Sequence, residues 1–329
     1  MNITVIGAGA WGTALAISLA ASHRVTLWAR DSAQMVAMRA ERCNHRYLPE
    51  IPLPETIELK ADFCAALENA DLAIIAAPSA ALRMILQQLA VYRQCVNVLW
   101  LCKGFEAQSS LLPHQVAAQV LSPEFHCGVL SGPSFAQEVA RGLPCALTLA
   151  SSDEIFARST AQALHHARLR LYASTDVIGV EVGGAVKNVM AIAAGISDGM
   201  GLGLNARAAL LTRGLAEITR LGLKLGGRPE TLGGLSGAGD LILTCTGDLS
   251  RNRQVGLLLA GQHQLPEILS RLGHVAEGVY TVREVHRYAL QLGVAMPICE
   301  AVYRILYQQV PAAEAVADLL NRTPNLEFS

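Results

Sequence analysis

Short apolar runs separated by glycine and polar residues dominate the first half of the chain. They lie at residues 3–6, 24–28, 72–77, 96–101, 127–130, 145–150 and 168–172. Apolar runs of this length, bounded by turn residues, predict buried strands. Helical segments such as 80–90 stand between several of them. Because strands that alternate with helices usually pair in parallel, we expect a largely parallel sheet here. The proline-containing segment 43–56 is expected to be a loop.

Helical patterns replace the strand pattern in the second half. The predicted helices lie at residues 179–196, 206–225, 252–260, 279–292 and 297–308. The glycine-rich segments 197–205 and 233–240 are expected to be loops, with Asn205 capping the helix after the first. We therefore place a domain boundary near Asp176. An α/β unit would cover residues 1–176 and an all-helical unit residues 177–329.

The first predicted strand leads directly into a glycine motif. Residues 7–12 read Gly-Ala-Gly-Ala-Trp-Gly, and a helix and a second strand follow. In this context Gly7 permits the turn, Gly9 lets a pyrophosphate approach the backbone, and Gly12 lets the helix pack on the strand. The helix N-terminus then faces the anion. The motif predicts a Rossmann-type dinucleotide site, and the alternative is a glycine-rich turn of another α/β fold.

The end of the second predicted strand bears on the choice of cofactor. NAD sites usually carry an acid there, which binds the ribose 2′-hydroxyl. Here Arg30 follows the strand and Asp31 comes after it. Arg30 is well placed for a 2′-phosphate, so we favour NADPH, whereas Asp31 leaves NADH open. The alternative for Arg30 is a solvated charge at the strand end.

The helix predicted at residues 179–196 is apolar on nearly every side but contains Lys187. Such a helix is normally buried. Gly183 and Gly184 lie one turn before the lysine and Ala191 one turn after it, so small residues surround it. Burial lowers the pKa of an ammonium group towards the range of proton transfer. The alternative is a structural lysine whose head reaches solvent or an acid.

Further polar residues follow apolar runs or begin helices. Lys103 and the turn 132–134 come directly after predicted strands, where ligands bind in parallel sheets. Asp240 ends a glycine-rich segment. Ser250 is a suitable helix cap, and Arg251 beside the free N–H groups of the next turn could bind a small anion. Taken singly, each could be an ordinary loop or surface residue.

Composition narrows the class of protein. The chain has 329 residues, of which 52% are hydrophobic and 16% charged, with a formal net charge of -1. This charge argues against a nucleic-acid partner or an anionic membrane. None of the eight cysteines forms a C-x-x-C pair, and no cluster has metal-ligand spacing, so we expect free thiols and no metal site. We see no signal peptide and no membrane span, and expect a cytoplasmic protein.

Several motifs together resemble one known family. They are Gly7–Gly12, Lys103-Gly104, Ser131–Ala136, Gly184–Asn188, Gly239–Leu241 and Ser250–Arg253. Their order is similar to that in the bacterial NAD(P)-dependent glycerol-3-phosphate dehydrogenases, and the resemblance spans nearly the whole chain. It implies reduction of dihydroxyacetone phosphate to sn-glycerol 3-phosphate, which supplies glycerophospholipid synthesis. It also allows a homodimer.

The resemblance assigns roles to individual residues. It implies that Lys187 is the catalytic proton donor. The substrate-binding residues would be Lys103, Gly132, Ser134, Lys187, Asp240, Ser250, Arg251 and Asn252. The cofactor-binding residues would be Gly7, Gly9, Ala10, Trp11, Gly12, Arg30, Lys103, Ala136, Arg251, Val275 and Glu277. Ala10 stands where the family often has serine, so one hydroxyl contact to the pyrophosphate would be lost.

Two alternatives remain at this stage. A related two-domain hydroxyacid or sugar-acid dehydrogenase would bind a carboxylate in place of the phosphate, and Arg251 suits both anions. A non-catalytic NADP-sensing protein would share the glycine motif but would have no use for Lys187 among small residues.

Overall fold

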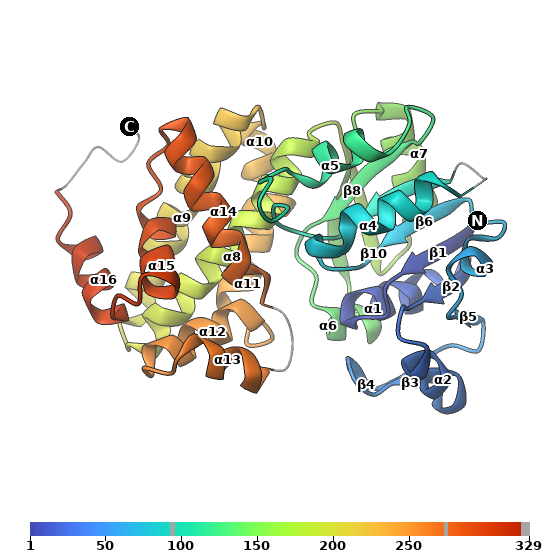
Figure 1. Ribbon diagram of the computed structural model, residues 1–329, viewed down its shortest axis with the longest axis horizontal. Coiled ribbons are helices and arrows are strands. Elements are labelled where there is room, and N and C mark those ends of the chain that lie inside the picture. Colours follow the sequence, from blue (N-terminus) through green and yellow to red (C-terminus); the bar gives the residue numbers. More distant parts are fainter. Residues whose placement is uncertain (93–95, 273–275, 324–329) are drawn as a thin grey trace.

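The computed structural model describes residues 1–92, 96–272 and 276–323. A sheet with helices on both faces forms the N-terminal part, and a bundle of helices forms the C-terminal part beside it (Figure 1). The long helix α8 (Val177–Gly199) begins at the side of the sheet and runs into the bundle. The predicted fold class is confirmed.

Within the described residues, the sheet has eight strands in the order β10-β9-β8-β7-β6-β1-β2-β5. Their bounds are β1 Asn2–Ile6, β2 Arg24–Trp28, β5 Ile57–Lys60, β6 Leu72–Ile75, β7 Asn97–Trp100, β8 Cys127–Ser131, β9 Cys145–Ala150 and β10 Leu169–Ser174. All neighbouring strands are parallel except β8 and β9. The chain moves outward from β1 in one direction and from β6 in the other, so the strand order reverses between them. Ligands bind beyond the carboxyl ends of strands at such a point.

Apolar side chains on the two sheet faces are covered by different helices. The helices that the structure describes in this part are α1 Ala10–Leu19, α2 Ser32–Glu41, α3 Phe63–Leu67, α4 Ser79–Ala90, α5 Pro113–Val120, α6 Ala136–Ala140 and α7 Glu154–Leu164. Val5 packs in the cluster that contains residues of α1, α2 and α7, and Ile6 in the cluster that contains residues of α4 and α5. Consecutive strand residues point to opposite faces, which explains the continuous apolar runs.

One prediction about this part was wrong, and one strand was not predicted. The segment 43–56 contains an antiparallel pair, β3 (Cys43–Asn44) and β4 (Leu48–Pro52). Prolines are tolerated in such a short ribbon because its outer N–H groups need no partner, and Leu48 and Ile51 bury against residues of α1 and α6. Strand β5, which the sequence pattern did not predict, extends the sheet beyond β2.

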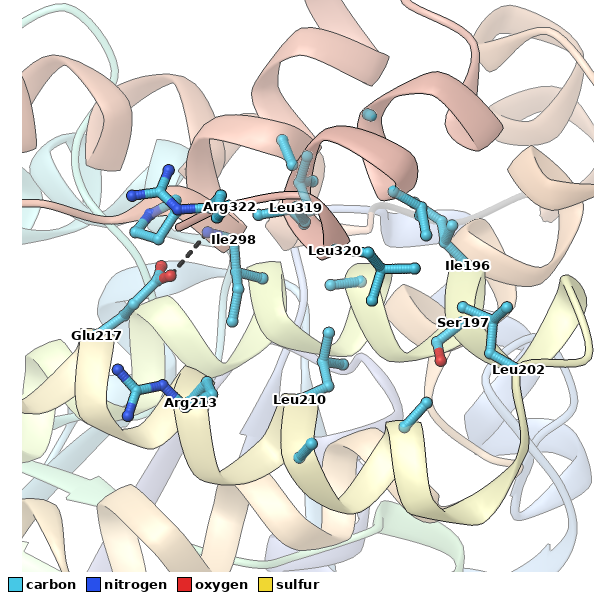
Figure 2. A pocket seen from close by; sticks show the side chains of 18 of the residues that line it. Ile196, Ser197, Leu202, Leu210, Arg213, Glu217, Ile298, Leu319, Leu320 and Arg322 are labelled. Carbon is cyan, nitrogen blue, oxygen red and sulfur yellow. Dashed lines mark hydrogen bonds between the residues drawn. The ribbon is translucent and has the colours of Figure 1, made fainter. Parts of the chain in front are cut away.

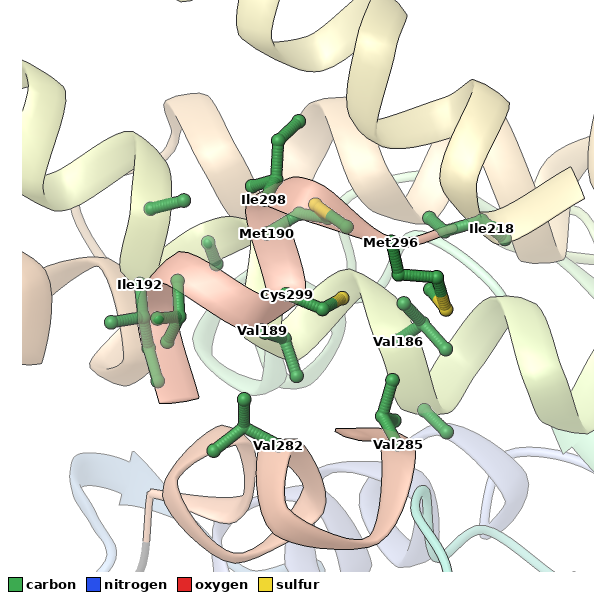
Figure 3. Packing of buried hydrophobic residues seen from close by; sticks show 14 of the residues in the cluster. Val186, Val189, Met190, Ile192, Ile218, Val282, Val285, Met296, Ile298 and Cys299 are labelled. Carbon is green, nitrogen blue, oxygen red and sulfur yellow. The ribbon is translucent and has the colours of Figure 1, made fainter. Parts of the chain in front are cut away.

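The helical part is built around α8. Its other helices are α9 Gly203–Leu225, α10 Pro229–Leu232, α11 Asp240–Thr246, α12 Arg251–Ala260, α13 Leu265–Leu272, α14 Glu277–Leu292, α15 Pro297–Tyr307 and α16 Ala312–Leu320. Side chains of α8 such as Val186 and Val189 meet Val282 and Val285 of α14, and Cys299 of α15 (Figure 3). Every residue of α8 from 179 to 197 is buried, as its sequence predicts.

Glycine lets α12 approach α8 closely. A Cβ at Gly195 would lie 2.0 Å from the Arg253 carbonyl oxygen, and a Cβ at Gly256 would lie 2.1 Å from that of Ile192. Among the described helices, α8 alone is long and apolar enough to cross a membrane. However, 89% of its apolar window is buried inside the protein, as befits the core helix of the bundle.

The two predicted glycine loops are shorter than expected. Helix α8 continues to Gly199 and α9 begins at Gly203, so Asn205 lies inside α9 and does not cap it. The segment 233–240 forms a π-helical turn at Leu235–Gly239 that continues into α11. A Cβ at Gly237 would lie 1.8 Å from the Leu232 carbonyl oxygen, so glycine is needed for this compact turn.

Buried polar groups fasten the first turns of α8. Asp176 caps the helix by accepting from Gly179 N at 2.8 Å, and its other oxygen accepts from Arg228 N at 2.8 Å. One turn later, Glu181 accepts from Trp100 Nε1 at 2.8 Å and from the backbone N of His114 at 3.0 Å. Trp100 ends β7, so these bonds tie α8 to the sheet.

Candidate active site

Lys187 lies in the middle of α8, and its ammonium group has two fixed partners. Its Nζ donates to Asp240 Oδ1 at 2.6 Å and to Thr244 Oγ1 at 2.7 Å, and its side chain is 8% exposed. Both partners belong to α11. The sequence left two hypotheses for this lysine, a role in proton transfer and a structural role with an acid partner. The acid partner is present, and it is compatible with a role in proton transfer.

Lys103 reaches the same carboxylate from the sheet. It follows the strand end of β7, and its Nζ donates to Asp240 Oδ2 at 2.5 Å. The Gly132 carbonyl oxygen, just beyond β8, lies 3.5 Å from the same Nζ. Lys103, Asp240 and Lys187, which are distant in sequence, thus form one cluster with two positive charges and one negative charge.

The glycines before Lys187 make room for this cluster. A Cβ at Gly184 would lie 3.0 Å from Ser131 Oγ and 3.5 Å from Lys103 Cδ. A Cβ at Gly183 would lie 2.6 Å from the Ser236 carbonyl oxygen in the π-helical turn. The Ser131 and Lys103 side chains and the turn that precedes Asp240 therefore approach the backbone of α8 closely at these two glycines.

Burial and charge set the protonation of the cluster. Burial lowers the pKa of Lys187 to about 8, with Lys103 acting in the same direction and Asp240 against it. Burial alone would raise the pKa of Asp240, but the ammonium groups of Lys103 and Lys187 hold this pKa below its usual range. At neutral pH the aspartate is therefore ionised and Lys187 is mostly a cation that is close to its titration range.

Thr244 is a site residue that the sequence analysis missed. Its hydroxyl donates to the Asp240 carbonyl oxygen at 2.6 Å, which leaves a lone pair for the Lys187 ammonium group. Four residues separate Asp240 from Thr244, so both lie on one face of α11. This spacing could have indicated that the two residues share a helix face. The glycine-rich segment before α11 made the short helix difficult to predict.

The remaining predicted substrate residues lie at loop ends and at the start of α12. Ser134 Oγ donates to the Gly132 carbonyl oxygen at 3.0 Å. Ser250 caps α12 as predicted and accepts from Arg253 N at 3.3 Å. The Asn252 side chain is buried. Its Nδ2 donates to Asn188 Oδ1 at 3.0 Å, and its Oδ1 accepts from Gly278 N at 3.0 Å, so the amide fixes the packing of α8, α12 and α14.

The glycine motif forms the expected cradle after β1. Gly7 has a φ of 122°, and a Cβ there would lie 2.5 Å from the Ala76 carbonyl oxygen. A Cβ at Gly12 would lie 2.0 Å from the Gly7 carbonyl oxygen. At Gly9, by contrast, no described atom beyond the neighbouring residues of the chain lies within 4 Å of a Cβ, so the backbone is open to a ligand there. Ala10 and Trp11 begin α1 directly after this opening. The cradle fits a dinucleotide pyrophosphate.

The two charged residues after β2, Arg30 and Asp31, differ in their hydrogen bonds. Asp31 caps α2 by accepting from Ala33 N at 3.0 Å and Gln34 N at 3.1 Å. Arg30 is exposed and has no hydrogen bond or ion pair within the described ranges. Asp31 Oδ1 is thus occupied by the helix, and Asp31 Oδ2 lies 3.7 Å from Arg46 Nη1. Arg30 is available to an anion.

The other predicted cofactor residues are spread over three elements. Ala136 begins α6, and Arg251 is an exposed residue in the first turn of α12. Burial raises the pKa of Glu277, at the start of α14, although Arg251, Lys103 and Lys187 act against this rise. Glu277 therefore lies within electrostatic reach of both lysines and Arg251. Val275 lies outside the described residues.

Neither metal-binding clusters nor disulfides are found in the described part of the chain. The groups that the structure offers for chemistry at this edge of the sheet are ammonium, carboxylate and hydroxyl groups.

A dinucleotide cradle and a lysine–carboxylate cluster beyond the carboxyl ends of parallel strands are typical of a dinucleotide-dependent dehydrogenase. Two family models match the chain over most of its length. Residues 2–157 match the N-terminus and residues 176–317 the C-terminus of NAD-dependent glycerol-3-phosphate dehydrogenase. The chain belongs to the NAD-dependent glycerol-3-phosphate dehydrogenase family.

Individual relatives agree with the family models. The glycerol-3-phosphate dehydrogenase [NAD(P)+] of Nitrosomonas eutropha is 60% identical over 327 residues, 99% of both chains. That of Thiobacillus denitrificans is 60% identical over 100% of both chains. The crystal structure of the Coxiella burnetii glycerol-3-phosphate dehydrogenase has a TM-score of 0.94 at 43% identity and covers 98% of this chain and 99% of its own.

Proposed function

We propose that this chain reduces dihydroxyacetone phosphate to sn-glycerol 3-phosphate with a hydride from NADPH or NADH. The product is the head-group precursor of glycerophospholipids. Family membership and the names of the full-length relatives support the reaction and the cofactor class. The observation that carries the mechanism is the Lys187 ammonium group, held at 2.6 Å by Asp240 beside the carboxyl ends of the strands.

Lys187 would supply the proton. A ketone carbonyl that accepts a hydride develops negative charge on its oxygen, and a positioned ammonium group stabilises this charge and then donates a proton. Because burial lowers the pKa of Lys187 to about 8, the group is protonated at neutral pH and yet releases its proton readily. In the reverse direction the neutral amine would accept the proton.

Lys103 and Asp240 would tune and position this group. Asp240 fixes Lys187 through one oxygen and Lys103 through the other. The three side chains together carry one net positive charge, which suits an oxygen that becomes an alkoxide. Lys103 would also contact the substrate and the cofactor, and Asp240 the substrate hydroxyl.

The start of α12 would hold the substrate phosphate. Because Ser250 accepts from Arg253 N, its own O–H remains available to an anion. Arg251 adds a charge, and the N–H groups of the first turn lie at the positive end of the helix dipole. The Asn252 side chain is engaged with Asn188, so we expect Asn252 to contribute its backbone N–H. Gly132 and Ser134 would border the substrate at the end of β8.

For the cofactor we propose that the cradle of Gly7, Gly9 and Gly12 binds the pyrophosphate. The rest of the dinucleotide would contact Ala10, Trp11, Ala136, Val275, Glu277 and Arg251. Arg30 would bind the 2′-phosphate of NADPH. The contacts of Asp31 support this preference, since its Oδ1 is already bonded to the N–H groups of α2 and its Oδ2 lies 3.7 Å from Arg46 Nη1. NADH remains an accepted cofactor.

We also propose a division into a dinucleotide-binding unit, residues 1–176, and a substrate-binding unit, residues 177–329. Helix α8 begins directly after the sheet, which supports a boundary there. We expect a cytoplasmic enzyme without a nucleic-acid partner or a membrane span. The proposed assembly is a homodimer.

The deciding experiment follows the loss of reduced-nicotinamide absorbance after dihydroxyacetone phosphate is added, with NADPH and NADH in parallel. We expect turnover with both cofactors and a higher kcat/KM with NADPH. Tight NADPH binding without any turnover would contradict the proposed reaction. Turnover with a preference for NADH would leave the reaction intact and contradict the role of Arg30.

A further inference from the structure

A cavity of about 710 Å³ lies in the helical part, and no predicted site residue lines it. Helices α8 and α9 form one wall, and α15 and α16 form the other (Figure 2). A volume of this size is typical of a small-molecule site, where common values are about 300–1,000 Å³.

The lining of this cavity is polarised. Apolar side chains that include Ile196, Leu202 and Leu320 line one end, and Arg213 and Arg322 lie towards the other (Figure 2). An apolar chamber with charge at one end suits an amphiphile, because the chain avoids water while the head group meets the charge.

The charged end has more positive than negative groups. Arg213, Glu217 and Arg220 are spaced along one face of α9, and Arg322 comes from beyond α16. Glu217 is the one acid among the described lining residues, against three arginines. Its carboxylate accepts from Ile298 N at 2.7 Å and Cys299 N at 3.2 Å, so both oxygens are engaged at the start of α15. The formal excess is two positive charges.

We propose that this cavity binds a single-chain lipid phosphomonoester, with its phosphate among Arg213, Arg220 and Arg322 and its chain between α8 and α16. A phosphomonoester carries about -1.5 to -2 charges at pH 7, which matches the excess of the arginines. Guanidinium groups bind phosphate oxygens in a bidentate manner. A carboxylate would balance half of this excess, and a neutral lipid none of it.

The test is calorimetric titration of the full chain with dodecyl phosphate below its micellar concentration. We expect one molecule to bind per chain. Ala206→Trp, which fills the cavity, and Arg213→Glu, which reverses a head-group charge, should each weaken binding at least tenfold. The matched controls on α9 are Ala208→Trp and Lys224→Glu, at exposed positions outside the cavity, and these should bind as the wild type does. Thermal melting verifies that all four variants fold.

Several results would overturn the proposal. The wild type could fail to bind, or the controls could lose as much affinity as the cavity variants. Equal binding of dodecyl phosphate and a neutral dodecyl detergent would rule out the arginine head-group site. Binding only by a chain that ends at Thr323 would mean that the terminal residues occupy the cavity. Conversion of a dimer into monomers by Ala206→Trp, seen by sedimentation, would mean that a second copy covers it.

Discussion

The cofactor cradle and the lysine cluster differ in how complete they are without ligands. The cradle is open at Gly9, and its flanking arginine, Arg30, is exposed and unpaired in the described part of the chain. The cluster around Lys187 is buried, and each of its charges already has a partner. A bound phosphate can complete the first region. The second must be built by the protein, because an ammonium group catalyses proton transfer only when it is positioned beforehand.

Removal of the Lys187 ammonium group should have the largest effect. We expect Lys187→Ala to lower kcat by about 10²–10⁴-fold, the usual contribution of a general acid. NADPH affinity should change little, because the cradle lies on the sheet. Absorbance assays measure the first quantity and NADPH fluorescence titration the second. Lys224→Ala, at an exposed position of α9, is the control, and a variant Lys187→Ala with wild-type kcat would refute the role of the lysine.

Neutralisation of Asp240 should have a smaller effect and move the pH profile. Lys187 acts as an acid, so the wild-type rate of reduction should fall as the pH rises through about 8. Asp240→Asn removes the charge that opposes the effect of burial, so this fall should move to lower pH. The loss of kcat should be roughly 10–100-fold, as expected for one charge-assisted hydrogen bond. Asp318→Asn is the control because this side chain is 54% exposed and lies on α16, away from the cluster. If the rate of Asp240→Asn falls at the same pH as that of the wild type, Asp240 does not influence the titration of Lys187.

Loss of Arg30 should affect only the cofactor side. We expect Arg30→Ala to raise KM for NADPH about tenfold, which corresponds to about 1.4 kcal/mol, and to leave KM for NADH nearly unchanged. Arg24→Ala, at the opposite end of β2, is exposed as well and should change neither value. Equal losses with both cofactors would place Arg30 away from the 2′-phosphate.

A rise in salt concentration should have the smallest effect of these changes, and it should affect the two regions differently. Between about 0.1 M and about 1 M ionic strength the Debye length falls from about 10 Å to about 3 Å. The exposed arginines are screened and the buried lysine cluster is not, so KM for NADPH should rise a few fold while kcat stays nearly constant. Steady-state assays over a salt series measure both values. A parallel fall in kcat would mean that the cluster is accessible to ions.

The sequence predicted those features that depend on local pattern. Apolar runs located most strands, and the glycine motif located the cradle. The all-round apolarity of α8 predicted its burial. The contact between Lys103 and Asp240 could not be predicted in this way, because they are 137 positions apart in the sequence and only the tertiary packing of α8, α11 and the turn before α11 beside the strand ends brings them together. Only the resemblance to a family indicated that both belong to one site.

Weak local signals account for the missed elements. Strand β5 is short, follows prolines and exposes Glu58, so its pattern resembles that of a loop. Thr244 was missed because α11 has only seven residues and follows a glycine-rich turn. The role of Asp31 as a cap was also missed, although an acid before a helix is a common N-cap.

The bonds of Glu181 have a consequence for how the molecule can open. Trp100 and His114 of the sheet part hold this residue on α8, so the first two turns of α8 belong mechanically to the sheet. The covalent crossover near Asp176 therefore cannot serve as a hinge unless a buried carboxylate loses three hydrogen bonds. Further along the helix, the bond between Asn252 and Asn188 and the close contacts at Gly195 and Gly256 hold α12 against α8. Lys187 lies between Glu181 and these contacts, so its place relative to the strand ends is fixed by both parts of the molecule.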